Sequence, residues 1–200
     1  VGIWADPDLG NASDDYVGCD VTRSLGYVYN GDADDDGVSG YGLLPPAAGV
    51  DILNGPLADL NDNTDNDHDG MVDEPGESIT MSSFIHYYNL NNYPNGNPNT
   101  TNGYYYYLQG IWLDSLPMFY GGNGRGSGPG ATTSSTTFMY PDNTNSLFAT
   151  PWTMNTAGLI PGDCRFLTGC GPFTMQPGEI NYLNNAVIWA RTTTAGSNMP

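Results

Sequence analysis

The sequence predicts a mainly β fold, namely a β-sandwich-like domain with long Asp/Gly/Asn-rich loops and one short helix. Three observations lead to this prediction. Segments rich in β-branched and aromatic residues recur along the chain, and clusters of Gly, Pro and Asn separate them. The chain contains 27 glycines and 15 prolines but also 14 tyrosines, a composition typical of loop-rich extracellular β proteins rather than of disordered chains. A length of 200 residues is enough for a single domain, residues 1–200, with a sizeable core.

The first half of the chain contains strand candidates at residues 1–4, 47–53 and 78–88. The last of these is the clearest, because it is rich in β-branched and aromatic residues. The segment 20–30 is ambiguous. Its residues Leu25, Tyr27 and Tyr29 alternate as in a strand, whereas Asp20 could cap a helical turn.

The second half contains the predicted helix, at about residues 103–114. Apolar side chains recur there at helical spacing, and Asn102 is a candidate N-cap. The glycine-rich segment 121–130 lacks the Gly-Lys-Ser/Thr of a phosphate loop, so we interpret it as a surface connection. Strands are expected at 132–140 and 180–191, and the second should place three residues in the core: Val187, Ile188 and Trp189.

The charge of the chain excludes several classes of function. There are 22 acidic residues against four arginines, and the net charge is −18. Binding to nucleic acids or to anionic membrane surfaces needs clusters of Lys and Arg, so both are excluded. No apolar stretch approaches the roughly 20 residues needed to span a bilayer.

The strongest motif is Asp65-x-Asp67-x-Asp69-Gly70, because carboxylates at alternate positions followed by glycine are typical of a calcium loop. Ca²⁺ prefers six to eight oxygen ligands at about 2.3–2.6 Å. The remaining ligands are expected from the carbonyl of Met71 and from Asp73, with either Glu74 or Glu77. Gly76 stands where an EF-hand has its last glutamate, so we expect a calcium loop in a β-rich setting rather than an EF-hand.

A second motif of the same kind lies upstream. Asp32-x-Asp34-x-Asp36-Gly37 is expected to bind a second Ca²⁺, with shared ligands from the acidic N-terminal segment: Asp6, Asp8 or Asp14. So many carboxylates with so few basic partners repel one another, and bound divalent cations would relieve that repulsion.

The cysteines and histidines predict no zinc site, because no Cys/His cluster has zinc-ligand spacing. Cys164 and Cys170 bracket a five-residue span that a turn could close, so a disulfide is expected in an oxidising compartment. Cys19 is expected to be a small buried residue. We expect His68 to face solvent and His86 to lie in the core or in a sheet.

Several segments together resemble a known family. They include Asp6-Pro7-Asp8-Leu9-Gly10, Asp69-Gly70-Met71-Val72-Asp73-Glu74-Pro75-Gly76-Glu77 and Gly171-Pro172-Phe173-Thr174-Met175-Gln176-Pro177-Gly178-Glu179. In their order they resemble a region of large secreted Bacteroidota surface proteins exported by the type IX secretion system. The resemblance covers nearly the whole chain and implies an extracellular, outer-surface location. It also implies that the chain is a fragment or a processed piece of a longer precursor. No chemistry is attached to the family region, and Cys164 and Cys170 depart from its pattern.

In such bacteria Asp114-Ser115-Leu116 is a candidate O-glycosylation motif at Ser115.

These observations predict a calcium-stabilised structural or adhesive module of the bacterial cell surface, for example a subunit of an extracellular fibre or filament. Its expected partners are Ca²⁺, further copies of itself and surface glycans. The alternative is a carbohydrate-binding module with exposed aromatic side chains in 104–107 or at Trp152. A hydrolase-associated domain is a third reading. We expect no enzymatic activity, since neither His-Glu-x-x-His nor Gly-x-Ser-x-Gly occurs in the chain.

Overall fold

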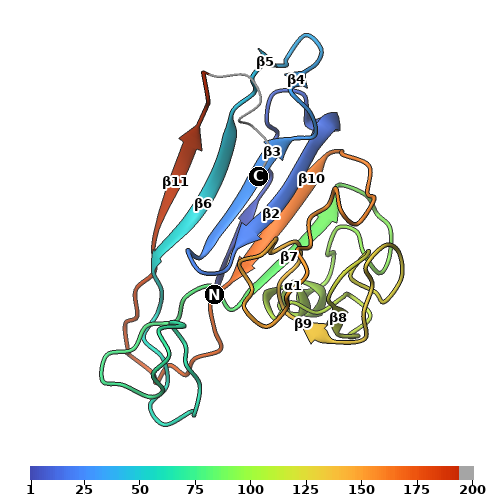
Figure 1. The fold of residues 1–200 in the computed structure, drawn as a ribbon. Coiled ribbons are helices and arrows are strands. Elements are labelled where there is room, and N and C mark those ends of the chain that lie inside the picture. The colour runs from blue at the N-terminus through green and yellow to red at the C-terminus, as the bar shows by residue number, and fades with distance from the viewer. Residues whose placement is uncertain (194–200) are drawn as a thin grey trace.

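Two antiparallel sheets form the centre of the computed structural model, which describes residues 1–193 (Figure 1). One sheet has the strand order β1-β10-β7, with bounds Gly2–Ala5, Cys164–Gly169 and Ser83–Tyr88. The other has the order β11-β6-β3-β2, with bounds Asn184–Ala190, Ala47–Asn54, Leu25–Asn30 and Asp15–Asp20. The predicted mainly β, sandwich-like fold is therefore confirmed.

The remaining elements are short and lie in the connections. Two small antiparallel pairs are β4 with β5 and β8 with β9, with bounds Asp34–Asp35, Gly42–Leu43, Met118–Phe119 and Ser135–Thr136. A 3-10 turn, η1, covers Ala12–Asp14, and the helix α1 covers Thr101–Leu108. No helix among the described residues has both the length and the apolar character needed to cross a membrane.

A glycine lets the two sheets approach closely. A Cβ atom on Gly26 of β3 would lie 2.8 Å from the Phe166 ring of β10 and 2.9 Å from the Phe84 ring of β7. These two rings pack against each other with their centroids 5.2 Å apart. Because a side chain at this position would collide with both rings, glycine brings β3 directly against the aromatic core.

The segment around residues 138–160 covers the free edge of β2. The amide of Cys19 donates to the carbonyl of Tyr140 at 3.1 Å, and the hydroxyl of Tyr16 donates to the carbonyl of Leu159 at 2.8 Å. Val17 and Cys19 are consequently fully buried. Cys19 and His86, which is also buried, lie where the sequence predicted them.

The strand predictions are partly confirmed. Strands occur within 1–4, 20–30, 47–53, 78–88 and 180–191, and 20–30 is a strand rather than a helical turn. The candidate 132–140 shortens to the two residues of β9. Within the two main sheets, β2 and β10 were not predicted from the sequence. Polar residues and glycines within both segments interrupt the apolar pattern, so the strands become favourable only when both faces are covered.

The helix prediction was correct in type but wrong in extent. The N-cap is Thr100, not Asn102, and the helix ends at Leu108. Gly110 has φ +67°, a left-handed conformation that ends a helix. Trp112 therefore lies outside the helix, where it is buried and donates from Nε1 to the carbonyl of Gly124 at 3.1 Å.

The predicted burial of β11 was wrong. Val187, Ile188 and Trp189 are 79%, 40% and 60% exposed. The strand lies at the edge of its sheet, beyond β6, whereas β10 and β7 of the other sheet pack against β2 at the opposite edge (Figure 1). Position in the sheet, rather than residue type, leaves these side chains uncovered.

Candidate metal centre

The loop between β6 and β7 contains the residues that best fit a metal ion. Ligand atoms of Asp65, Asp67 and Asp69 all lie within 4.8 Å of one another. The three residues alternate along a tightly turning chain, so their carboxylates point toward a common space. The structure thus brings together the first three predicted ligands.

A second group in the same loop shares one of these residues. Ligand atoms of Asp67, Glu74 and Glu77 also lie within 4.8 Å of one another. Glu77 is buried, with 7% of its surface exposed, and accepts a short hydrogen bond from the amide of Asn66. The loop folds back on itself, so both glutamates that the sequence left as alternatives join the cluster through Asp67.

Backbone amides hold the carboxylates in place. Asp65 accepts from the amides of Asp69 at 3.1 Å and Gly70 at 3.0 Å, and Asp67 accepts from Asp69 at 3.1 Å. Asp69 accepts from the amide of Met71 at 2.8 Å. Gly70 has φ +96°, which a glycine adopts without steric cost. The turn therefore orients the side chains before any ion binds.

The donor set fits a hard divalent cation. All five clustered side chains supply carboxylate oxygens, which suit Ca²⁺. Among the described residues the ion pairs of the arginines lie elsewhere, on Asp20, Asp114 and Asp6. One oxygen of Glu74 is buried and accepts no hydrogen bond from the described residues. The cluster thus has negative charge without a basic neighbour to balance it.

Electrostatics at Glu74 point the same way. Its own backbone amide lowers the pKa of this carboxyl, but desolvation and the charges of Glu77, Asp69 and Asp67 act against that bond and leave the pKa raised. A bound cation would reverse this repulsion, because an opposite charge within a few ångströms favours the ionised carboxylate.

Two further residues were predicted as ligands, Asp73 through its side chain and Met71 through its carbonyl, and neither side chain belongs to the cluster. Asp73 is in neither group and instead accepts from the amide of Asn63, 3.3 Å from both carboxylate oxygens. The side chain of Met71 is exposed, and a role for its carbonyl stays a prediction. His68 is exposed, as expected, with its ring Nδ1 3.1 Å from the hydroxyl of Thr80.

The second predicted calcium loop is not gathered into a site. Asp32, Asp34 and Asp36 are all exposed and form no ligand group in the described part of the chain. The neighbouring Asp35 is buried and accepts from the amides of Asn11 at 3.0 Å and Tyr41 at 2.8 Å. This aspartate, which lies between the predicted ligands, binds two loops together through hydrogen bonds.

Asp14 lies beside this loop rather than in a metal group. Burial is the largest influence on its carboxyl and raises the pKa, while the backbone amide of Asp36 lowers it and the charges of Asp35 and Asp32 raise it further. The structure therefore supports proximity of Asp14 to the second loop, but not a common ion site.

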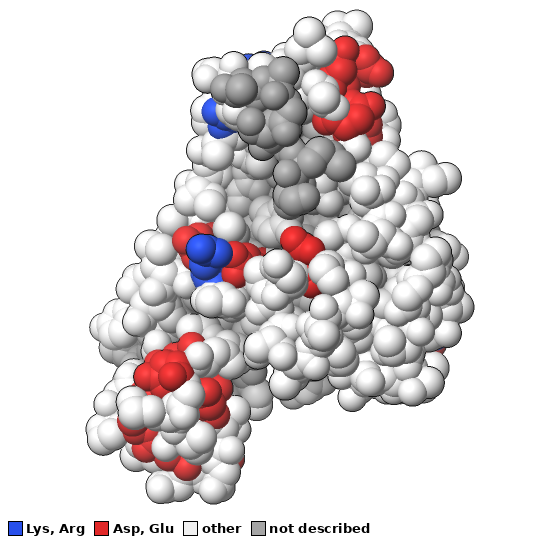
Figure 2. Space-filling view, in the orientation of Figure 1, with Lys and Arg blue, Asp and Glu red and all other residues white. Residues whose placement is uncertain are grey.

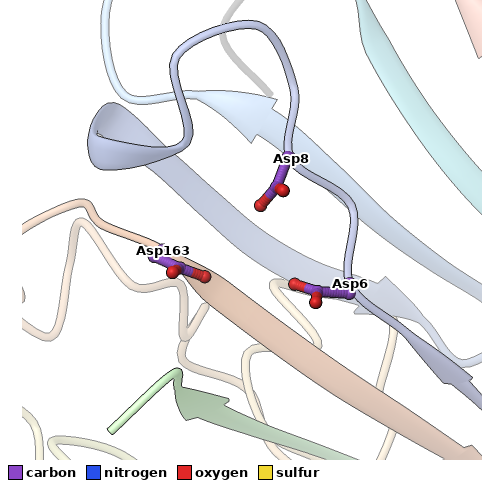
Figure 3. A group of neighbouring side chains, drawn as sticks. All are labelled: Asp6, Asp8 and Asp163. Carbon is purple, nitrogen blue, oxygen red and sulfur yellow. The ribbon is translucent and has the colours of Figure 1, made fainter.

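Asp6 and Asp8 lie elsewhere, together with Asp163 (Figure 3). Asp163 comes just before β10, and Asp6 just after β1; the antiparallel pairing of these strands brings the two aspartates together. Arg165 already supplies a cation here, with its guanidinium 2.8 Å from the Asp6 carboxylate. No spacing in the sequence could identify Asp163, because only the strand pairing places it here.

The structure contradicts the predicted disulfide. Cys164 and Cys170 are unpaired and buried, like Cys19. The segment between them is the strand β10 rather than a turn. Six residues of strand separate the two cysteines by about 20 Å, whereas disulfide-linked Cα atoms lie about 4.4–6.8 Å apart. Burial raises the pKa of the Cys170 thiol to about 11.

The residues proposed for the other functions have mixed environments. Ser115 is exposed at the end of a turn, so its O-glycosylation stays a prediction. Trp152 is buried and donates from Nε1 to the carbonyl of Gly122 at 3.0 Å, so it cannot serve as an exposed sugar platform. Tyr107 is also buried, whereas Tyr104 and Tyr105 are 51% and 58% exposed.

Comparisons with protein-family models, with characterised proteins and with solved structures give no significant match.

Proposed function

We propose that this chain is a calcium-stabilised structural or adhesive module of a bacterial cell surface, with Ca²⁺ bound in the loop of residues 65–77. One observation supports the calcium site above all others. Asp65, Asp67 and Asp69 form one ligand group, Asp67, Glu74 and Glu77 form another, and Asp67 belongs to both.

The physical argument rests on repulsion and its relief. Five carboxylates gathered in one loop destabilise the folded state, because an unfolded chain would hold the same charges farther apart. An ion that binds this arrangement and not the unfolded chain stabilises the fold by mass action. The loop connects β6 to β7, which belong to different sheets, so calcium would hold the connection between the two layers.

The extracellular role draws on other observations. The composition and the resemblance to secreted Bacteroidota surface proteins both favour the cell surface. Millimolar calcium outside the cell matches the weaker affinities, about 10⁻⁴–10⁻³ M, of extracellular calcium modules. Among the aromatic residues considered for sugar stacking, Trp152 and Tyr107 are buried and only Tyr104 and Tyr105 are well exposed, so the structural role has more support than carbohydrate binding at these residues.

Thermal unfolding tests the calcium site. We expect millimolar Ca²⁺ to raise the Tm relative to EGTA, by several degrees once the ion is well above its Kd. Asp67→Asn should weaken Ca²⁺ binding, measured by calorimetry, at least about tenfold, because affinity depends on the number of charged ligands.

Asp34→Asn is the matched control. It changes the same residue type in the exposed loop that forms no ligand group, so it should leave the main binding step unchanged. An identical melting curve in Ca²⁺ and EGTA would show that the 65–77 loop is merely solvated and that the proposal is wrong.

A further inference from the structure

The edge strand β11 has the sequence of an interior strand. It reads Asn184-Asn185-Ala186-Val187-Ile188-Trp189-Ala190 and carries no charged residue. β6 pairs with one side of it, and within the described residues no strand pairs with the other. Natural edges are commonly protected by charges, prolines or covering segments, and the apolar centre of β11 has none of these charges or prolines.

Both faces of β11 are apolar and exposed. Successive residues of a strand point to opposite faces, so Val187 and Trp189 share one face and Ile188 lies on the other. Their exposures are 79%, 60% and 40%. Strands that are apolar on both faces are typical of buried sheets, and an exposed apolar edge strand is a template for pairing with another chain. At the other edge of this sheet, β2 is covered through Tyr140 and Met154.

We propose that β11 pairs in antiparallel fashion with β11 of a second copy of this chain, so that the two four-stranded sheets join into one continuous sheet. This inference rests on the structural role proposed above and names the surface through which copies assemble. A two-fold axis near Val187 would place the apolar residues of each strand opposite those of the other. Such an interface is self-complementary, as two-fold dimers require.

Exposed apolar side chains lie along and just before the edge strand that would join the two copies. Besides the three residues of β11, the preceding segment exposes Ile180 and Tyr182 by 74% and 69%. With aromatic side chains of about 150–250 Å² each, the five together expose on the order of 600 Å² per copy. Edge-to-edge pairing covers the flanks of these side chains that meet the partner strand, while their outer faces stay open, and it also buries the backbone groups along the free side of β11 in each copy.

The edge strand itself carries no charge that would oppose contact with a second copy. In a chain with 22 acidic residues, β11 contains none. Figure 2 shows large groups of acidic side chains at opposite ends of the molecule, at the calcium loop and near β4. Antiparallel pairing brings the acidic end of one copy toward the opposite acidic end of the other. Bound Ca²⁺ and salt should therefore strengthen the dimer, because they reduce this repulsion.

The test measures the dimer dissociation constant by sedimentation in saturating Ca²⁺. Val187→Lys places like charges opposite each other across the axis, and we expect it to raise the dissociation constant at least about tenfold. Ile188→Lys tests the other face in the same way. Leu147→Lys is the matched control, because Leu147 is 81% exposed outside the sheets, and it should leave the constant unchanged.

A measurement on the unaltered protein guards against misfolded variants. Hydrogen exchange should show amides of β11 becoming more protected as protein concentration rises, while the covered strand β2 stays unchanged. A protein that is monomeric at all concentrations, or a dimer that both lysine variants leave intact, would overturn the proposal. If Ca²⁺ still raised the Tm of that monomer, the calcium site would stand and only this interface would be lost.

Discussion

Asp15 shows how strongly the interior of this protein changes a single carboxyl group. It is 2% exposed, and one of its oxygens accepts from the amide of Leu9 at 3.0 Å. The other accepts no hydrogen bond from the described residues. Burial raises the pKa of Asp15 to about 8, although the Leu9 amide opposes the shift. The group is therefore mostly protonated at neutral pH.

This pKa predicts a loss of stability as pH rises. The folded protein holds a proton on Asp15 up to about pH 8, whereas the unfolded chain releases it near the ordinary value of 3.8. Between these values the folded state binds more protons, so the free energy of unfolding falls as pH increases. Asp15→Asn should flatten this dependence, because the amide keeps the acceptor for Leu9 and does not titrate.

The measurement is urea unfolding in EGTA at about pH 5 and about pH 9. We expect the fall in stability between the two pH values to be clearly smaller in Asp15→Asn than in the unaltered protein. Asp34→Asn, at an exposed site, provides the comparison for a change in net charge alone. Equal pH dependence in all three proteins would mean that Asp15 is ionised in the fold.

The roles of some residues could be predicted from their spacing in the sequence, and the roles of others could not. The group Asp65, Asp67 and Asp69 was predicted because neighbours in a tight turn share one space, whatever surrounds the turn. Asp35 and Asp163 were not predicted. Asp35 accepts a hydrogen bond from the amide of Asn11, and Asp163 lies beside the carboxylate of Asp6, so both contacts join segments far apart in the sequence. Such contacts depend on how distant segments meet.

At the level of elements, α1 depends on its cap. The side chain of Thr100 accepts from the amide of Gly103 at 3.0 Å, and the helix is only eight residues long. So short a helix is not stable by itself. The cap and the burial of Tyr107, whose hydroxyl donates to the carbonyl of Gly96 at 2.7 Å, hold it in place.

Removing the cap should destabilise the protein measurably. Thr100→Ala leaves the Gly103 amide without its acceptor, at a cost of about 1 kcal/mol in the free energy of unfolding. Thr101→Ala is the control, because it removes an exposed hydroxyl from the first helical residue. The two are compared by urea unfolding, and equal stabilities would show that the cap contributes nothing.

The strands show why local pattern is an incomplete guide at this level. β10 begins at Cys164 and ends one residue before Cys170, and the short span between the two cysteines suggested a turn closed by a disulfide. The strand forms because β1 pairs on one side and β7 on the other. β11 shows the opposite error, since its apolar run suggested a central strand and the structure places it at an edge.

For the whole molecule, the net charge of −18 makes stability depend on screening. Repulsion among carboxylates favours the unfolded state, and dissolved salt shortens its range to about 8–10 Å at physiological strength. We expect NaCl to raise the Tm in EGTA by a few degrees, and to have a smaller effect when Ca²⁺ is present. A Tm that does not respond to NaCl in EGTA would show that the acidic groups are already too far apart to interact.

Two features followed from residue order alone: the β-rich class and the tight turn at 65–70 that gathers three aspartates. Each depends on composition or on neighbours within a few residues, where chain geometry permits few alternatives. Pairing between distant strands decided the rest. It placed Asp163 beside Asp6, separated Cys164 from Cys170 along an extended strand, and left β11 exposed. These outcomes depend on which segments meet in the folded chain, and the spacing of neighbouring residues in the sequence does not determine those meetings.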